Sequence, residues 1–391
     1  MRLRFLTAGE SHGPALAVIV EGLPAGLAVD SAAIDRELRR RMGGHGRGGR
    51  MRIERDRVEI LSGARFGRTL GSPVTLLIRN LDHDNWIEAM RPGGPPPSSA
   101  EQARAVTRPR PGHADLAGAL KYDTHDARDV LERSSARETA ARTAAGAVAQ
   151  ALLREAGATV TSRTVAVGAV EAPDEAERFD ELLDLAEDAP LRVLDPAARG
   201  AMVAAIDDAR ARQDSIGGVF EVLARGVPPG LGSPAHWDRR LDGRIGGALL
   251  SIQAVKAVAI GEGIEATTRP GSEQHDAITY DPAARAFLRA TNRAGGIEGG
   301  MTNGEIVRAR GYLKPLATLP RPLATVDLVT KAAVVAAVER TDTIPIVAAG
   351  VVGEAMLALV LADELLIKFG GDSVDEMRRN LSAYRDALRA Y

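Results

Sequence analysis

The stretch that decides the fold is IPIVAAGVVGEAMLALVLA, residues Ile344 to Ala362. It imitates a membrane span, but it contains Pro345 and two glycines, and Glu354 lies near its middle. A carboxylate at the centre of a bilayer costs about 2.5–3.5 kcal/mol. The N-terminal MRLRFLTAGESHG lacks the apolar segment of a signal peptide. We therefore expect a helix buried against a sheet, in a soluble, cytoplasmic protein with no membrane partner.

Outward from this helix, apolar runs bounded by glycine and proline alternate irregularly with amphipathic segments. The expected strands are Arg2 to Thr7, Leu16 to Glu21, Val58 to Leu61, Pro73 to Ile78, Thr159 to Val170, Gly217 to Val222 and Glu305 to Arg310. The expected helices are Ala32 to Met42, Arg137 to Ala156, Ala197 to Arg212, Trp237 to Leu250, Lys331 to Val338 and Pro345 to Lys368. Because strands and helices follow no regular βαβ order, the sequence predicts an α+β fold, as a single large domain over 1–391. Residues 80–112, which include PGGPPPSS at 92–99, are expected to form a long loop.

Composition limits the possible functions. The 391 residues are 45% hydrophobic, enough for a large core without disulfide or metal staples. The absence of cysteine excludes disulfides, thiolate metal sites and a cysteine nucleophile. A net charge of −2 and only 3% aromatic residues argue against nucleic-acid binding. The basic residues are 45 arginines and five lysines; arginine suits carboxylates and phosphates, although base composition accounts for most of the excess.

A glycine-rich loop, RMGGHGRGGR, carries Arg41, His45, Arg47 and Arg50. Glycine lets the backbone approach a ligand closely, so this loop favours a polyanion. The loop contains a G-x-G-x-x-G match without the preceding strand and following helix of a dinucleotide-binding fold, and no lysine follows a glycine as a P-loop requires. A solvated turn and an RNA-binding segment remain alternatives.

Two histidines are candidates for proton transfer, with a purely structural role as the alternative. His12 lies in GESHG just after an expected strand, and His113 follows Pro-Gly in RPRPGHADL. RSSARETA places Ser135 and Glu138 at the spacing of a capping box, and the free N–H groups of that helix start favour an anion site. No metal-ligand spacing of histidines occurs, so we expect no metal site.

Taken together, these motifs resemble the chorismate synthase family, in its monofunctional form. In chain order they are TAGESHG, GHGRGGRM, LGSP, RPGHADL, RSSARETA, SIQAVKAVAIG, NRAGGIEGGMTNG, KPLAT and ERTDTIP. Each is weak alone, but nine in one order are specific. Residues 157–234 carry little of the resemblance.

The resemblance implies a βαβ sandwich, usually assembled as a homotetramer. It implies a carbon–oxygen lyase that converts 5-enolpyruvylshikimate 3-phosphate to chorismate by 1,4-anti elimination of phosphate, the last step of the shikimate pathway. The reaction needs reduced FMN without net redox change, and NADPH is the expected ultimate reductant. The length leaves no room for a reductase domain, so we expect an external flavin reductase or another source of reduced FMN.

The resemblance also implies residue roles. His12 resembles the histidine that protonates reduced flavin, His113 the one that protonates the departing phosphate, and Asp342 the carboxylate that assists proton removal. The implied FMN contacts are Arg133, Ser134, Ser135, Gln253, Ala254, Gly299, Lys314, Pro315, Leu316, Ala317, Thr318 and Arg340. The implied contacts to substrate or NADPH are Arg41, Arg47, Arg50, Arg110 and Arg137. This fits the residues themselves, because a substrate with two carboxylates and a phosphate calls for arginine forks.

Two alternatives stay open at this point. One is a flavin-independent enzyme that releases phosphate from a similar anionic sugar acid. The other is an RNA-binding module built on the Arg/Gly loop, which would bind RNA with a steep salt dependence.

Overall fold

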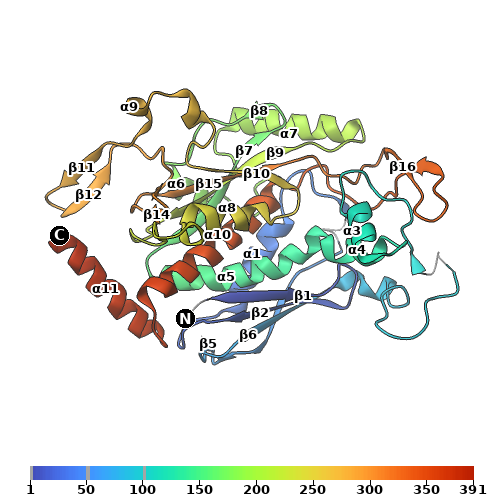
Figure 1. The fold of residues 1–391 in the computed structure, drawn as a ribbon, viewed down its shortest axis with the longest axis horizontal. Helices are drawn as coiled ribbons and strands as arrows, with labels where there is room; N and C mark the ends of the chain where they lie inside the picture. Colours follow the sequence, from blue (N-terminus) through green and yellow to red (C-terminus); the bar gives the residue numbers. More distant parts are fainter. Residues whose placement is uncertain (1–2, 50–52, 100–102) are drawn as a thin grey trace.

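Helix α10 (Ile346–Phe369) is at the centre of the fold in the computed structural model, which describes residues 3–49, 53–99 and 103–391 (Figure 1). It is apolar on every side and nearly all its residues are buried. By length and composition this helix could cross a membrane, but 94% of its most apolar window is buried inside the protein. Gly350 and Gly353 let the helix lie directly on a strand, because a Cβ at Gly353 would be 2.6 Å from the ring of Phe220. The expected helix packed against a sheet is confirmed.

The carboxylate of Glu354, in the middle of α10, is fully buried and compensated. Both terminal nitrogens of Arg40 donate to it at 2.7 Å, and Ser162 Oγ donates at 2.6 Å. Burial by itself would raise the pKa of Glu354, but the charge and hydrogen bonds of Arg40 hold it below its ordinary value. A buried charge is tolerated only when it is paired. The partners of Glu354 come from helix α1 (Ser31–Met42), which carries Arg40, and from strand β7 (Thr159–Val167), which carries Ser162, so Glu354 joins α10 to both elements.

Two antiparallel sheets enclose the helices. The first has the order β1 (Arg4–Ala8), β2 (Ala15–Glu21), β6 (Val74–Arg79), β3 (Val58–Ser62). The second has the order β10 (Val255–Ile260), β15 (Val307–Leu313), β9 (Gly218–Arg225), β7, β8 (Val170–Glu171). Residues of β2 and β6 alternate between buried and more exposed, as expected for strands with one face on a core.

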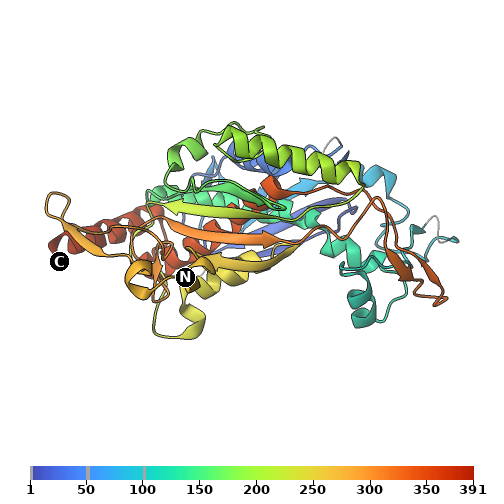
Figure 2. The same ribbon diagram turned by 90° about the horizontal axis from the view of Figure 1, so that it is seen from above.

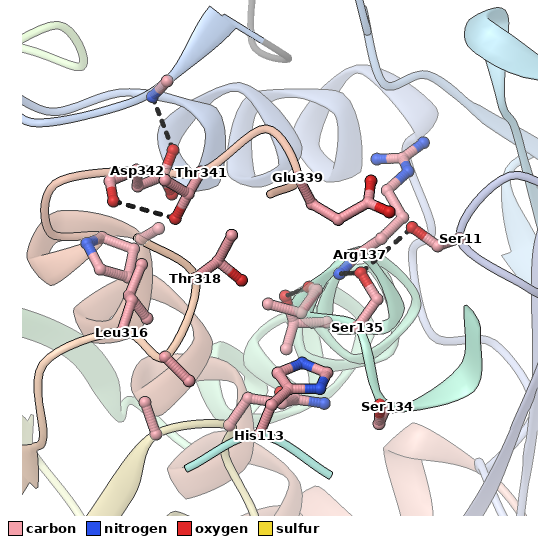
Figure 3. A pocket seen from close by; sticks show the side chains of 18 of the residues that line it. Ser11, His113, Ser134, Ser135, Arg137, Leu316, Thr318, Glu339, Thr341 and Asp342 are labelled. Atoms are coloured by element: carbon pink, nitrogen blue, oxygen red, sulfur yellow. Dashed lines mark hydrogen bonds between the residues drawn. The ribbon is translucent and has the colours of Figure 1, made fainter. Parts of the chain in front are cut away.

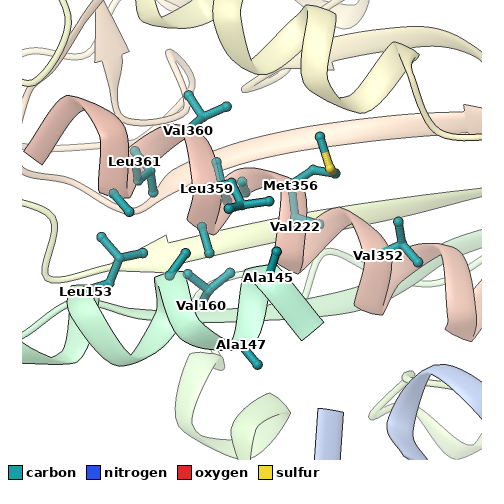
Figure 4. Close-up of a cluster of buried hydrophobic side chains, with 14 of the residues drawn as sticks. Ala145, Ala147, Leu153, Val160, Val222, Val352, Met356, Leu359, Val360 and Leu361 are labelled. Atoms are coloured by element: carbon teal, nitrogen blue, oxygen red, sulfur yellow. The ribbon is translucent and has the colours of Figure 1, made fainter. Parts of the chain in front are cut away.

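Helix α5 (Thr139–Glu155) packs on the first sheet and α10 on the second, so the layers from bottom to top of Figure 1 are sheet, helices, sheet, and Figure 2 shows the strands of the second sheet from above. The two helices pack against each other along their alanine-rich faces, with Val160 and Val222 of the second sheet beside them (Figure 4). One apolar cluster spans both sheets and the helices between them. This architecture matches the predicted α+β fold.

The remaining elements surround this sandwich. The helices and helical turns are η2 (Leu81–Asn85), α3 (Asp115–Tyr122), α4 (Arg128–Ser134), η3 (Ala136–Glu138), α6 (Phe179–Leu183), α7 (Pro196–Ala211), η4 (Trp237–Arg239), α8 (Leu241–Leu250), η5 (Glu265–Thr268), α9 (Gly271–Gln274) and α11 (Val374–Ala390). The short strands are β4 (Ala64–Arg65), β5 (Arg68–Thr69), β11 (Ile278–Asp281), β12 (Ala286–Arg289), β13 (Ile297–Glu298), β14 (Met301–Thr302), β16 (Ala324–Val326) and β17 (Ala333–Val335). Helix α11 and the β11–β12 hairpin lie at one end of the molecule, and α3, α4 and the β16–β17 hairpin at the other (Figure 1).

One predicted helix is wrong. Residues 331–338 contain strand β17, paired with β16. The Asp327 carboxylate accepts from the N–H groups of Val329 and Thr330, and Lys331 adopts a left-handed φ of +61°, so the chain turns back on itself. The β-branched pair Val334 and Val335 then suits a hairpin strand. The other expected elements occur with shifted bounds, and the expected helix over 237–250 is divided into η4 and α8. The first strand begins at residue 4; residue 2, where it was expected to begin, lies outside the described residues.

Candidate active site

A cavity of about 560 Å³ lies where the first turns of α5 and α10 meet the glycine-rich loop that follows α1 (Figure 3). Segments from seven separate parts of the sequence line it: 11–12, 41–49, 110–114, 131–139, 252–254, 313–318 and 339–352. A volume of this size suits small-molecule ligands.

The start of α5 contributes hydroxyl groups to the cavity. Ser135 Oγ accepts from the N–H of Arg137 at 3.3 Å and from Ser11 Oγ at 3.1 Å. The Glu138 carboxylate instead accepts from Thr7 and from Arg142. The predicted capping box is therefore wrong, because Ser135 caps a short 3₁₀ turn and Glu138 is held by other elements.

The glycine-rich loop packs tightly on the segment before α10. A Cβ at Gly48 would be 2.2 Å from the carbonyl oxygen of Thr341, so only glycine fits. The Asp342 carboxylate accepts from the N–H of Gly48 at 2.6 Å, and Arg47 Nη1 lies 2.8 Å from its other oxygen. Two motifs that are about 300 residues apart in sequence thus form one wall of the cavity.

Arg41 and Arg137 are buried side by side and share the carboxylate of Asp56, which is itself buried. Arg137 Nη1 lies 2.7 Å from that carboxylate and Arg41 Nη1 lies 3.4 Å from it. Arg41 also donates to Thr139 Oγ1 at 2.9 Å, and Arg137 donates to Asn80 Oδ1 at 2.9 Å. Such fixed guanidinium groups are pre-organised for an anionic ligand.

Arg110, His113 and Asp115 form a second charged cluster. The backbone N–H and the Nε of Arg110 donate to Asp115, at 3.0 and 2.8 Å, and His113 Nδ1 lies 2.5 Å from the same carboxylate. Burial alone would raise the pKa of Asp115, but the hydrogen bonds from His113 and Arg110 hold it well below its ordinary value. Arg110 Nη1 also donates to Thr318 Oγ1 at 2.8 Å, which joins this cluster to the KPLAT loop.

His12 lines the cavity from the loop after β1. Its Nδ1 lies 2.8 Å from Glu132 Oε1, and its ring stacks on Trp86. Burial would raise the pKa of Glu132, but the hydrogen bond and charge of His12 hold it below its ordinary value.

The structure brings most of the predicted site residues together. Those that line the cavity are His12, Arg41, Arg47, Arg110, His113, Ser134, Ser135, Arg137, Gln253, Ala254, Lys314, Leu316, Ala317, Thr318, Arg340 and Asp342. Arg133, Gly299 and Pro315 are not among the lining residues. Arg133 is instead exposed and donates to the carbonyl groups of Thr7 and Gly9. Arg50 lies outside the described residues.

Sequence reasoning missed part of the lining. Ser11, Glu339 and Thr341 lie inside or beside quoted motifs, so their position was a signal that could have found them. The apolar wall gave no signal, because its members read as ordinary core residues: Leu131, Ile252, Leu313, Ala348, Ala349 and Val352.

The lining has six basic side chains against two acidic ones, Glu339 and Asp342. The arrangement can bind several oxyanions at once, and two histidines lie among them. Fold and cavity together are those of an α+β protein with a cationic site of small-molecule size.

Comparison with known proteins identifies the family. The sequence model of the chorismate synthase family matches residues 3–366. The chorismate synthase of Moorella thermoacetica is 54% identical to the chain, and the match covers 99% of each of the two proteins. That of Anaeromyxobacter sp. (strain K) is also 54% identical, and the match covers 100% of each. A crystal structure of chorismate synthase matches with a TM-score of 0.79 at 40% identity, covering 100% of this chain and 99% of that one.

The chain belongs to the chorismate synthase family. It is a lyase acting on phosphates, and its function is the last step of the shikimate pathway. The family expectation and the predicted fold class are confirmed.

Proposed function

We propose that the cavity binds reduced FMN next to 5-enolpyruvylshikimate 3-phosphate. The observation that carries this proposal is a pair of buried polar atoms, Ser134 Oγ and Gln253 Oε1, which have no hydrogen-bond partner among the described residues. A buried polar atom without a partner is costly. Both residues line the cavity and both belong to the predicted cofactor set. Their unused hydrogen-bonding capacity fits a ligand with several donors and acceptors, as a flavin has.

The arginines bind and orient the anions. Arg41 and Arg137 are held by Asp56, Arg47 is held by Asp342, and Arg110 and Lys314 lie at or beside the KPLAT loop. The substrate brings two carboxylates and a phosphate, and FMN brings a second phosphate, so these cations have partners. When bound, reduced FMN supplies the electron that the elimination needs and receives it back, so that no net redox change results.

Three side chains hold or move protons. His113, fixed by Asp115, donates a proton to the departing phosphate. His12, when both ring nitrogens carry a proton, donates the Nε2 proton toward the bound cofactor. Asp342 assists removal of the ring hydrogen, and its bonds to Gly48 and Arg47 fix its position at the cavity wall.

The finer expectations belong to the same proposal. We infer NADPH as the ultimate reductant, an external source of reduced FMN, a homotetramer, one domain over 1–391 and a cytoplasmic location. Support comes from the family, whose members share this reaction, and from the apolar cluster that spans both sheets.

The experiment is an anaerobic titration of FMN in the presence of substrate, read from the flavin spectrum, with chorismate formation measured alongside. Gln253→Ala should raise the FMN dissociation constant about 5-fold, since one hydrogen bond contributes about 1 kcal/mol. Gln274→Ala is the matched control, because its Oε1 is also buried without a partner but lies on α9, away from the cavity. Chorismate formation without flavin, or an unperturbed flavin spectrum, would refute the proposal.

A further inference from the structure

Glu132 holds two donors of His12 at once. Its Oε2 accepts from the backbone N–H of His12 at 2.8 Å, and its Oε1 lies 2.8 Å from Nδ1 of the ring. The side chain of Glu132 is only 2% exposed. With its pKa held below the ordinary value, Glu132 is a carboxylate at neutral pH and can only accept hydrogen bonds. The proton between the two groups therefore resides on Nδ1.

Trp86 fixes the plane of the same ring. The ring centroids of His12 and Trp86 are 3.8 Å apart and the planes differ by 23°. The guanidinium of Arg104 lies 3.9 Å from a ring centroid of Trp86, and that of Arg128 lies 5.0 Å from it. Trp86 is 5% exposed, and its Nε1 donates to Asp82. The imidazole is thus held both by its edge and by its face.

We propose that Glu132 and Trp86 are positioning residues, which keep a proton on Nδ1 of His12 so that Nε2 is the nitrogen that takes up a proton and passes it to the bound ligand. The inference rests on the proposed role of His12. It also gives a role to the segment that begins the long loop at residue 80, because this segment supplies Trp86. The contact set joins two elements remote in sequence, the loop after β1 and helix α4, which are also linked by the Ser11 N–H donating to the Glu132 carbonyl oxygen and by Arg133 donating to the carbonyl oxygen of Gly9.

The substitution Glu132→Gln keeps the size of the side chain but replaces its carboxylate with an amide. A glutamine has one acceptor oxygen and one NH₂ group, while the site presents two donors. The backbone N–H of His12 cannot change, so the glutamine oxygen faces it and the NH₂ group faces Nδ1. Nδ1 then becomes an acceptor, and the proton moves to Nε2. Arg128, which lies 3.4 Å from Glu132, keeps its other partner, Glu339, at 2.8 Å.

The direct test is ¹⁵N NMR of the ligand-free protein labelled in histidine, at about pH 8 where histidine is ordinarily neutral. We expect His12 to show a protonated Nδ1 in the natural chain and a protonated Nε2 in Glu132→Gln, with His12→Asn used to assign the signal. A proton on Nε2 together with an unprotonated Nδ1 in the natural chain would overturn the proposal, whatever the variants show.

Kinetics give the second readout. Glu132→Gln should lower kcat about 10- to 100-fold, the usual effect of removing the group that orients a histidine, while the FMN dissociation constant changes less than 2-fold. Trp86→Leu should lower kcat with the Nδ1–H tautomer retained. Glu59→Gln, in an exposed ion pair with Arg79, is the matched control and should leave kcat unchanged.

The outcomes separate the two proposals. If His12→Asn keeps the natural kcat, the role of His12 is refuted and the positioning role with it. If His12→Asn loses activity but Glu132→Gln keeps both kcat and the Nδ1–H tautomer, only the positioning proposal is refuted. Thermal denaturation of each variant shows whether a loss of kcat is a loss of folded protein.

Discussion

The substitution Gly146→Ala tests the packing that places both halves of the active site. Gly146 lies on α5, and a Cβ there would be 2.2 Å from the Cβ of Ala355 and 2.4 Å from its Cα, on α10. These two helices carry pocket residues at their first turns. The atoms in the way belong to the backbone and to a methyl group, so no side-chain rotation relieves the clash.

The expected change in the free energy of unfolding combines two opposed effects. Overpacking of a core costs about 1–3 kcal/mol, and the upper end applies here because backbone must move. Replacing a helical glycine by alanine stabilises by about 1 kcal/mol. The net destabilisation is about 2 kcal/mol. With an unfolding entropy of about 2.1 cal/mol/K per residue, a chain of this length loses about 1.2 °C of Tm per kcal/mol, hence about 2–3 °C.

The assay is thermal unfolding monitored by circular dichroism, with Gly200→Ala as the control. Gly200 lies in helix α7, and a Cβ there meets nothing within 4 Å. The control should therefore show only the gain in helix propensity, a Tm higher by about 1 °C. If both variants shift Tm upward by the same amount, the close α5–α10 contact is not as described and the reasoning fails.

Two further predictions concern the charged groups of the cavity. Arg47→Ala should raise KM about 10-fold or more, since a hydrogen bond to a charged group contributes about 1.5–3 kcal/mol, while the Tm of the variant stays within about 1 °C of the natural chain. The control is Arg4→Ala, at an exposed ion pair, which should change neither KM nor Tm. An equal loss of binding and stability in Arg47→Ala would contradict a role of Arg47 in binding. Asp115 has a pKa below its ordinary 3.8 in the folded chain, so its stabilising effect is present above pH 3.8 and is lost as the pH falls below that value. Asp115→Asn, which leaves Arg110 buried without its carboxylate, should lower the free energy of unfolding at pH 7 by about 3 kcal/mol and make urea unfolding less sensitive to acid; an unchanged acid dependence would contradict this.

Local patterns predicted much of the fold. The apolar stretch of α10 and the bounded runs of β2 and β6 were recognisable because their periodicity reports which faces are buried. Residues 331–338 were misassigned because KAAVVAAV suits a helix as well as a strand, and only pairing with β16 decides between them. The helices α3 and α4 were not predicted, since they lie near a proline-rich segment whose local pattern is irregular.

In the candidate site, too, some residues could be recognised from the sequence and others only from the fold. Motifs with glycine and charge marked His12, His113 and Asp342, which line one cavity together with most of the predicted arginines. The partners of His113, Arg110 and Asp115, lie in the same motif, but the partners of His12 carried no such mark. Glu132 reads as an ordinary helix residue, and only the fold shows that it is buried against His12.

The sequence by itself indicated most of the polar residues that line the cavity and which helix must be buried, because charge, glycine and apolar periodicity are properties of the chain. The tertiary structure decided which groups meet. A carboxylate can orient a histidine, and a guanidinium can pair with a buried acid, only at distances near 3 Å. Such distances arise between the start of α5, the start of α10 and the glycine-rich loop only when the two sheets close on the helices between them.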